Sequence, residues 1–96
     1  MKLLKIVPSE RPEKKYKAVF EDSKGSSKTV HFGADGYKDF ISSKGNEVKK
    51  KAYIARHSVN EKWNKPDTAG SLSRYILWNK PTLNESIKDY KKRFNL

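Results

Sequence analysis

The chain has 96 residues, of which 22 are lysine or arginine and 11 are aspartate or glutamate, so its formal net charge is +11. A chain of this length has room for one domain, residues 1–96, and for no second core. It contains no cysteine, which excludes a disulfide framework, a thiolate zinc site and a cysteine nucleophile.

The sequence predicts neither a membrane span nor a secretion signal. Its longest apolar run is Tyr75–Trp78, which is far too short to cross a bilayer. Residues 1–8 carry a lysine inside their apolar stretch and no small-residue cleavage site, so they do not form a signal peptide. We therefore expect a non-secreted protein with no membrane partner.

Three strands are predicted over about residues 2–32. Leu3–Val7 ends at Pro8, which lacks the N–H that a sheet ladder needs. Residues 15–21 and 28–32 alternate polar with apolar, and the short Gly-containing segment between them is typical of an antiparallel hairpin. The sequence therefore predicts a meander of three strands. The residues expected on its apolar faces are Tyr16, Ala18, Phe20, Val30 and Phe32.

Residues 33–45 are predicted to form a turn and an irregular segment. Gly33 and Gly36 suit a tight turn with positive φ, and we expect them to end the sheet. The Gly-x-x-Gly spacing also occurs in nucleic-acid clamps, but there it joins two helices. The next segment, Tyr37–Ile41, has no clear period, and one interpretation is an extended piece that lays Phe40 on the sheet.

A first helix is predicted over about residues 46–58, with Asn46 as its N-cap. The apolar residues of this segment recur at helical spacing, and Lys49–Lys51 and Arg56 lie largely off the face that they form. The residues expected on this apolar face are Val48, Ala52, Ala55 and Val59.

A short repeat organises the C-terminal part of the chain. Trp63-Asn64-Lys65-Pro66 recurs as Trp78-Asn79-Lys80-Pro81. In each copy we expect Trp to close one element, Asn to take a left-handed turn and Pro to begin the next element. Truncating either Trp to Ala should cost about 3–5 kcal/mol.

Two further helices follow from this repeat, over about residues 68–78 and 82–94. The second begins with a capping box, Thr82 and Glu85. The residues expected to be buried are Leu72 and Ile76 in one helix, and Leu83, Ile87, Tyr90 and Phe94 in the other. The predicted fold class is therefore α+β: a small antiparallel sheet of about three strands followed by about three helices packed on one face.

No motif for catalysis is present, and we expect no catalytic residue, no metal site and no cofactor. His31 faces away from Val30 and Phe32, which favours a solvated or hydrogen-bonded strand residue. His57 ends a helix, where an imidazolium would interact with the negative end of the helix dipole. An enzyme would need a cleft that unites His57 with a carboxylate, either Asp39 or Glu61.

The surplus of basic residues predicts an anionic partner, because solubility alone needs a net charge of only about 2–8. The charge is mainly lysine, which suits phosphate better than guanine edges, so we expect sequence-neutral binding of nucleic acid, and of DNA in particular. The residues predicted to contact phosphates are Lys49, Lys50, Lys51, Arg56, Lys62, Arg74, Lys91, Lys92 and Arg93. The alternative is a structural or minor virion protein that binds an acidic protein surface, which predicts an exposed apolar patch.

A pattern of aromatic and polar residues runs through residues 28–94. Its parts are His31-Phe32-Gly33-Ala34-x-Gly36-Tyr37-x-Asp39-Phe40, Tyr53-x-x-Arg56-His57-x-x-Asn60-Glu61-x-Trp63-Asn64-x-Pro66-x-Thr68-Ala69-Gly70 and Ser73-Arg74-x-x-Leu77-Trp78-Asn79-Lys80-Pro81. In this pattern the chain resembles a family of small basic proteins of unknown function, encoded mainly by large DNA viruses of algae and amoebae. The resemblance implies a viral or virus-related protein, which we expect in the virion or the infected host cell. Genome packaging or compaction is the role expected from the nucleic-acid-binding hypothesis.

The resemblance assigns no activity to any residue. Five polar residues of the pattern have two interpretations: a buried network that holds the helix junctions, which we favour, or a binding surface. These residues are Asp39, Arg56, His57, Asn60 and Arg74.

Overall fold

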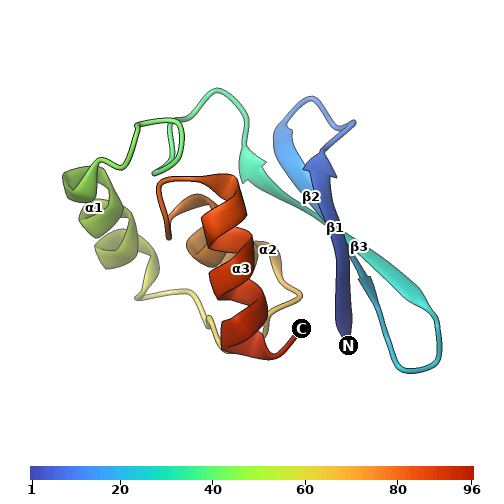
Figure 1. Cartoon of the computed structure of the whole chain (residues 1–96). Coiled ribbons are helices and arrows are strands. Elements are labelled where there is room, and N and C mark those ends of the chain that lie inside the picture. The colour runs from blue at the N-terminus through green and yellow to red at the C-terminus, as the bar shows by residue number, and fades with distance from the viewer.

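A computed structural model describes residues 1–96 and shows the predicted α+β architecture (Figure 1). The strands β1 (Lys2–Pro8), β2 (Lys14–Glu21) and β3 (Ser27–Ala34) form one antiparallel sheet in the order β1-β2-β3. The helices that follow are α1 (Glu47–His57), α2 (Ala69–Leu72), the π-helical turn η1 (Ser73–Leu77) and α3 (Leu83–Phe94). No helix has the length and the apolar character needed to span a bilayer.

The sheet buries the face that the alternating pattern predicts. In the β2–β3 hairpin Tyr16 pairs with Phe32, and their rings stack with centroids 6.1 Å apart. Ala18 and Phe20, further along the same face of β2, are buried. The register of β1 against β2 shifts between Leu3 and Lys5, so the irregularity lies near the start of this edge strand.

The prediction that Gly33 ends the sheet is wrong, because β3 continues through Ala34, which pairs with Lys14. Gly33 lies within the strand with φ +82°, and η1 comes very close to it. A Cβ atom on Gly33 would lie 2.8 Å from Leu77 Cδ1. The predicted turn follows at Gly36, whose φ is +86°.

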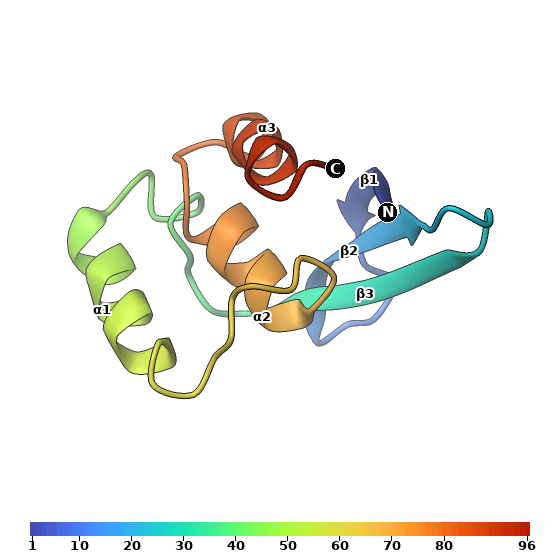
Figure 2. The same ribbon diagram turned by 90° about the horizontal axis from the view of Figure 1, so that it is seen from below.

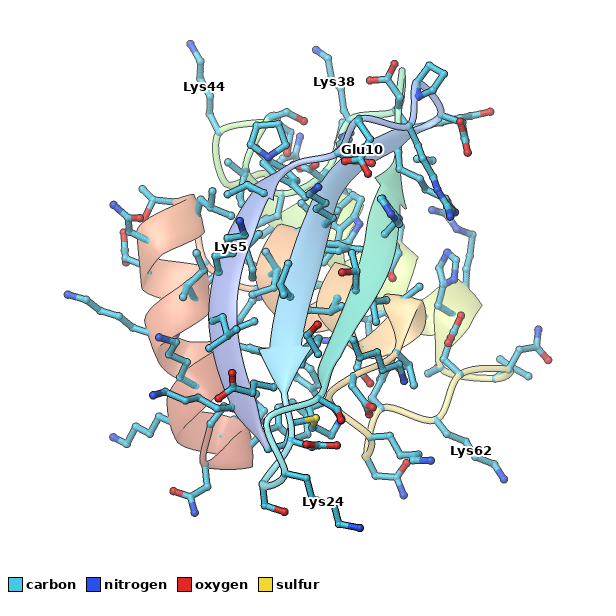
Figure 3. All side chains as sticks on the ribbon, turned by 90° about the vertical axis from the view of Figure 1, so that its right-hand side faces the viewer. Lys5, Glu10, Lys24, Lys38, Lys44 and Lys62 are labelled. Atoms are coloured by element: carbon cyan, nitrogen blue, oxygen red, sulfur yellow. The ribbon has the colours of Figure 1, made fainter.

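The helices lie on one side of the sheet, and α2 and η1 make the contact with β3 (Figure 2). The other face of the sheet is open (Figure 3). α3 packs on η1, and α1 lies furthest from the sheet. As predicted, Leu72, Ile76 and Tyr90 are fully buried. The Tyr90 hydroxyl donates a hydrogen bond to the Pro66 carbonyl at 2.6 Å, which ties α3 to the segment before α2.

The helix ends agree with the caps that the sequence predicts. The side chains of Asn46, Thr68 and Thr82 accept hydrogen bonds from backbone N–H groups of α1, α2 and α3 respectively. Thr82 also donates to Glu85 Oε1 at 2.9 Å, so the carboxylate of the capping box bonds the hydroxyl of Thr82. These caps satisfy N–H groups that have no partner within their helix.

The predicted apolar face of α1 is wrong. Val48 and Val59 are 78% and 80% exposed, and Ala52 and Ala55 are exposed as well. The side chain that α1 buries is Tyr53. An aromatic ring buries far more apolar area than Ala or Val, so Tyr53 determines which face turns inward.

The two copies of the Trp-Asn-Lys-Pro repeat are followed by similar helix starts, but they are not equivalent. Neither Asn64 nor Asn79 has a positive φ, so the predicted left-handed turn is wrong. Asn79 is buried, and its side-chain amide donates to the Tyr75 carbonyl and to Asp89 Oδ2, at 3.1 and 2.6 Å. Asn64 is exposed.

Phe40 is buried, but the extended interpretation of its segment is wrong. Residues 40–44 form turns, and the Phe40 N–H donates to the carbonyl of Leu77 at 3.1 Å. Phe40 therefore packs at the end of η1, and this contact draws residues 37–39 towards the helical part of the molecule.

Candidate functional site

A cleft of about 520 Å³ opens between the sheet, the segment after β3, α1 and η1. This volume is in the range of about 300–1,000 Å³ that is usual for ligand sites. Lys14 and Gly33 contribute from neighbouring strands, and Tyr37, Arg56 and Trp78 from the segments that face them. Many residues of the aromatic and polar pattern in residues 28–94 therefore meet at this one place.

A column of three aromatic rings lies at one wall of the cleft. The ring of Tyr53 stacks on His57, with centroids 4.2 Å apart, and on Trp78, with centroids 4.6 Å apart. Burial, followed by the negative charge of Glu61, raises the pKa of Tyr53 to about 12, so its phenol is neutral at physiological pH. This column joins α1 to the end of η1.

Basic side chains outnumber acidic ones in the lining of the cleft. The acidic side chains are Asp39 and Glu61. The basic side chains are Lys14, Lys15, Lys38, Lys49 and Arg56, and we call the cleft that they line the basic cleft. Lys15 pairs with Asp39 at 2.7 Å, whereas none of the other four forms an ion pair. Four cationic groups are therefore available to an anionic ligand.

The Lys15–Asp39 pair fixes the segment that carries Tyr37 and Lys38. The side chains of Lys15 and Asp39 are 17% and 7% exposed, and the Lys15 ammonium also donates to the Tyr37 carbonyl. Asp39 and Ser42 bond reciprocally: Asp39 Oδ1 accepts from the Ser42 N–H, and the Ser42 hydroxyl accepts from the Asp39 N–H, both at 2.8 Å. Tyr37 and Lys38 thus project from a braced turn.

Glu61 lies against the start of α2. A Cβ atom on Gly70 would be 2.1 Å from Glu61 Oε2, so a side chain at position 70 would displace this carboxylate. The carboxylate forms no ion pair. It is the acidic group of the cleft whose charge is not neutralised by a neighbouring lysine.

The cleft brings His57, Asp39 and Glu61 together, as an enzyme would require. No hydrogen bond joins His57 to either carboxylate, however, and Asp39 is occupied by Lys15 and Ser42. No group of three or more metal-ligating side chains is found either.

Among the nine residues predicted to contact phosphates, Lys49 and Arg56 line the basic cleft, and both are exposed. Lys51 is exposed on α1, and Lys62 projects from the segment after it (Figure 3). Lys91, Lys92 and Arg93 are exposed on α3, where Arg93 pairs with Asp89 at 3.3 Å. None of these five lines the cleft.

Lys50 and Arg74 turn inward. The Lys50 ammonium donates to the Asn79 carbonyl at 2.9 Å and lies 4.9 Å from the centre of the Phe40 ring. The Arg74 guanidinium donates to the Trp78 carbonyl at 2.8 Å, and burial lowers its pKa. Both cations stabilise the junction at the end of η1.

Sequence reasoning missed the other basic residues of the cleft, Lys14, Lys15 and Lys38. The hairpin register could have revealed them. Because Lys14 pairs with Ala34, the start of β2 lies beside the segment that contains Gly36 and Lys38. The favoured buried network is also wrong: no side-chain hydrogen bond joins its five polar residues, whose one mutual hydrogen bond is the backbone bond from the Asn60 N–H to the His57 carbonyl, and Arg56 and Asn60 are exposed. Asp39, Arg56 and His57 of that set line the cleft.

The basic residues as a whole do not converge on one face. In Figure 3, Lys5, Lys24, Lys38, Lys44 and Lys62 project from different parts of the molecule. The basic cleft differs from the rest of the cationic surface because it combines unpaired charge with a hollow.

A family model described as "Family of unknown function (DUF5754)" matches residues 4–57, which is more than half of the chain. All five basic residues of the cleft fall within this stretch, whereas α2, η1 and α3 lie beyond it. No curated protein and no solved structure matches the chain.

Proposed function

The chain belongs to the DUF5754 family, and we propose that it binds nucleic acid, DNA in particular, through backbone phosphates at the basic cleft and without sequence preference. The observation that carries this proposal is the set of unpaired cations, Lys14, Lys38, Lys49 and Arg56, around one hollow. Basic side chains without ion-pair partners can release counterions from a nucleic acid, which is the main source of sequence-independent affinity.

The chemistry of the cleft favours phosphate over base edges. Three of its four unpaired cations are lysines, which act as point charges. The fourth is an arginine, whose planar guanidinium can donate two parallel hydrogen bonds. Reading of base edges in a groove relies on arginine, asparagine or glutamine presented by a helix or ribbon. A sequence-neutral contact with the backbone is the better match.

Packaging or compaction of a viral genome, in the virion or the infected cell, is the role that we propose on the basis of the resemblance and the net charge of +11. The alternative, a structural protein on an acidic partner, predicts an exposed apolar patch. The most exposed large apolar side chains come from the start of β1, the segment after β3 and the two ends of α1, and no single element gathers them. These side chains are Val48, Val59, Tyr37, Met1 and Leu4. The dispersal of the lysines outside the cleft is the observation in favour of this alternative.

The first prediction concerns two exposed cations of the cleft. The double variant Lys49→Gln/Arg56→Gln should weaken binding to a fluorescent oligonucleotide about tenfold, which corresponds to roughly 1.4 kcal/mol. For each phosphate that is no longer neutralised, the slope of log affinity against log salt should also become shallower, by about 0.7 on a single strand or about 0.9 on a duplex. Fluorescence anisotropy over a salt series measures both quantities.

The matched control is Lys91→Gln/Lys92→Gln on α3, which removes the same charge from exposed residues outside the cleft. We expect it to change affinity and slope much less. Equal effects of the two double variants would show that net charge alone drives binding. Binding that is independent of salt in the unchanged protein would overturn the proposal, and capture of an acidic protein instead would favour the structural role.

A further inference from the structure

We infer that the basic cleft accepts a single strand of nucleic acid in preference to a duplex, with one base stacked on the ring of Tyr37. This inference rests on the proposed function and specifies which form of nucleic acid the cleft takes. Its evidence is the concave shape of the cleft, the exposure of one aromatic ring at its rim and the bracing of the turn that carries this ring.

The shape of the site is the first argument. A duplex is a convex cylinder with its phosphates on the outside, so it would bridge the rim of a hollow of about 520 Å³ without filling it. A single strand has a flexible backbone that can enter the hollow and meet cations on opposite walls. Lys14 and Lys38 come from the side of the sheet, and Lys49 and Arg56 from α1. A positively charged groove with aromatic side chains is the usual site for single strands.

The second argument identifies the ring that can stack on a base. Tyr53 is covered on one face by His57 and on the other by Trp78. Trp78 is only 9% exposed, and His57 is half-buried with one face on Tyr53. Tyr37, in contrast, is 75% exposed. It is the aromatic residue of the cleft that has free surface for a base.

The third argument is that the backbone at Tyr37 is held in place before a ligand arrives. Its carbonyl accepts a hydrogen bond from Lys15, and Asp39, two residues further on, is held by Lys15 and Ser42. A braced turn loses little conformational entropy on binding, so more of the stacking energy appears as affinity. The neighbouring Lys38 makes no ion pair and is available to the phosphate next to the stacked base.

Stacking on Tyr37 would tolerate any base, because every base has a π-face. The inference thus agrees with sequence-neutral binding. Within the proposed packaging role, it directs the protein to unpaired stretches of nucleic acid, such as those that arise when a genome is threaded.

The test compares three probes of equal length: an oligothymidine of about twelve nucleotides, a DNA strand of abasic sites, and a duplex. The proteins are the unchanged chain, Tyr37→Ala, Tyr37→Phe and Leu4→Ala, the last being an exposed apolar control on β1. Because Tyr37 is exposed, its substitution should leave the folded state intact, and circular dichroism checks this.

We expect the unchanged protein to bind oligothymidine more tightly than the duplex or the abasic strand. Tyr37→Ala should weaken oligothymidine binding about 5- to 150-fold and bring it to the level of the abasic strand. Tyr37→Phe, which keeps the ring, and Leu4→Ala should retain the affinity.

Equal affinity for duplex and single strand, or unaltered oligothymidine binding by Tyr37→Ala, would overturn the inference. If either result came with a loss of binding in Lys49→Gln/Arg56→Gln, the proposed function would stand without the single-strand preference. If that double variant also bound normally, the proposed function would fall as well.

Discussion

Neighbouring basic residues of α1 differ in whether their charge faces the basic cleft or is bound inside the molecule. Lys49 is exposed at the basic cleft, whereas the next residue, Lys50, turns inward to the Asn79 carbonyl at 2.9 Å. Successive residues on a helix point about 100° apart, so adjacent lysines necessarily face different surroundings. Arg74 is likewise used inside the molecule, at the Trp78 carbonyl. The net charge of +11 thus overstates the charge that is free for a ligand.

Gly33 permits the close contact between β3 and η1, and this gives a second prediction. Gly33→Ala should lower the free energy of unfolding by about 2–5 kcal/mol, because a positive φ costs roughly 1–2 kcal/mol and overpacking against Leu77 costs roughly 1–3 kcal/mol more. Urea denaturation followed by circular dichroism measures the loss of stability.

Gly25 provides the matched control for this change. Its φ is also +82°, but a Cβ atom there meets nothing within 4 Å. Gly25→Ala should therefore lower the free energy of unfolding only by the cost of the positive φ, about 1–2 kcal/mol. Equal destabilisation by Gly33→Ala and Gly25→Ala would show that the clash with Leu77 adds nothing to the cost of the positive φ.

The third prediction concerns Asp89, whose pKa lies below its ordinary value of 3.8, chiefly because the side-chain amide of Asn79 donates to it at 2.6 Å. A lowered pKa in the folded state means that the stabilisation is present above the ordinary value and disappears as pH falls through the folded value. Asp89→Asn should therefore be less stable than the unchanged chain at neutral pH, and the difference should shrink below about pH 4.

Urea denaturation at neutral and acidic pH measures this difference. Asp35→Asn, on an exposed turn without an ion pair, serves as the control. A difference between Asp89→Asn and the unchanged chain that stays constant down to about pH 2 would contradict the prediction.

At the scale of the elements, the two copies of the repeat have the same residues but differ in the burial and contacts of those residues. Trp78 is 9% exposed and stacks on Tyr53 at 4.6 Å. Trp63 is half-buried, its indole N–H has no acceptor, and Arg74 lies 5.6 Å from its ring centre. The sequence predicts equal importance for the two tryptophans, whereas their surroundings favour Trp78.

The fourth prediction follows from this contrast. Trp78→Ala should cost about 3–5 kcal/mol, as expected for a buried tryptophan, and Trp63→Ala should cost about 1–3 kcal/mol. Thermal or urea unfolding of the two single variants gives the comparison. A larger destabilisation by Trp63→Ala than by Trp78→Ala would contradict the assignment of Trp78 as the main junction residue.

Much of this element structure could be predicted from local patterns. The meander and α3 follow from alternation and helical spacing, and the caps at Asn46, Thr68 and Thr82 follow from residue type. The π-helical η1 could not be predicted, because its wide turns, which end with the Trp78 N–H donating to the Ser73 carbonyl, depend on tertiary contacts. The inward face of α1 was also missed, because periodicity weighs Ala and Val equally with a large ring.

At the scale of the whole molecule, the basic cleft was beyond the reach of sequence patterns. Its basic residues come from β2, from the turn after β3 and from α1, and the closure of the sheet against the helices brings them together. Composition predicts an anionic partner, and the runs of lysine point to α1 and α3. Only α1 lines the cleft, because α3 packs on η1. The packing of the helices on the sheet therefore decides that the lysines of α1, and not those of α3, line the cleft. A pattern in a short stretch of sequence does not contain this packing.

The attachment of α1 has a consequence for the lifetime of a complex. This helix forms one wall of the cleft and lies apart from the sheet. It is attached through the buried Tyr53, the partly buried Ile54 and the bond from Lys50 to the Asn79 carbonyl, so its detachment should require less free energy than global unfolding. If the cleft binds a strand as we propose, an outward movement of α1 would release that strand sideways, and the strand would not have to slide out along its length. The rate at which α1 moves outward would then set the dissociation rate, and a long polymer could dissociate as readily as a short one.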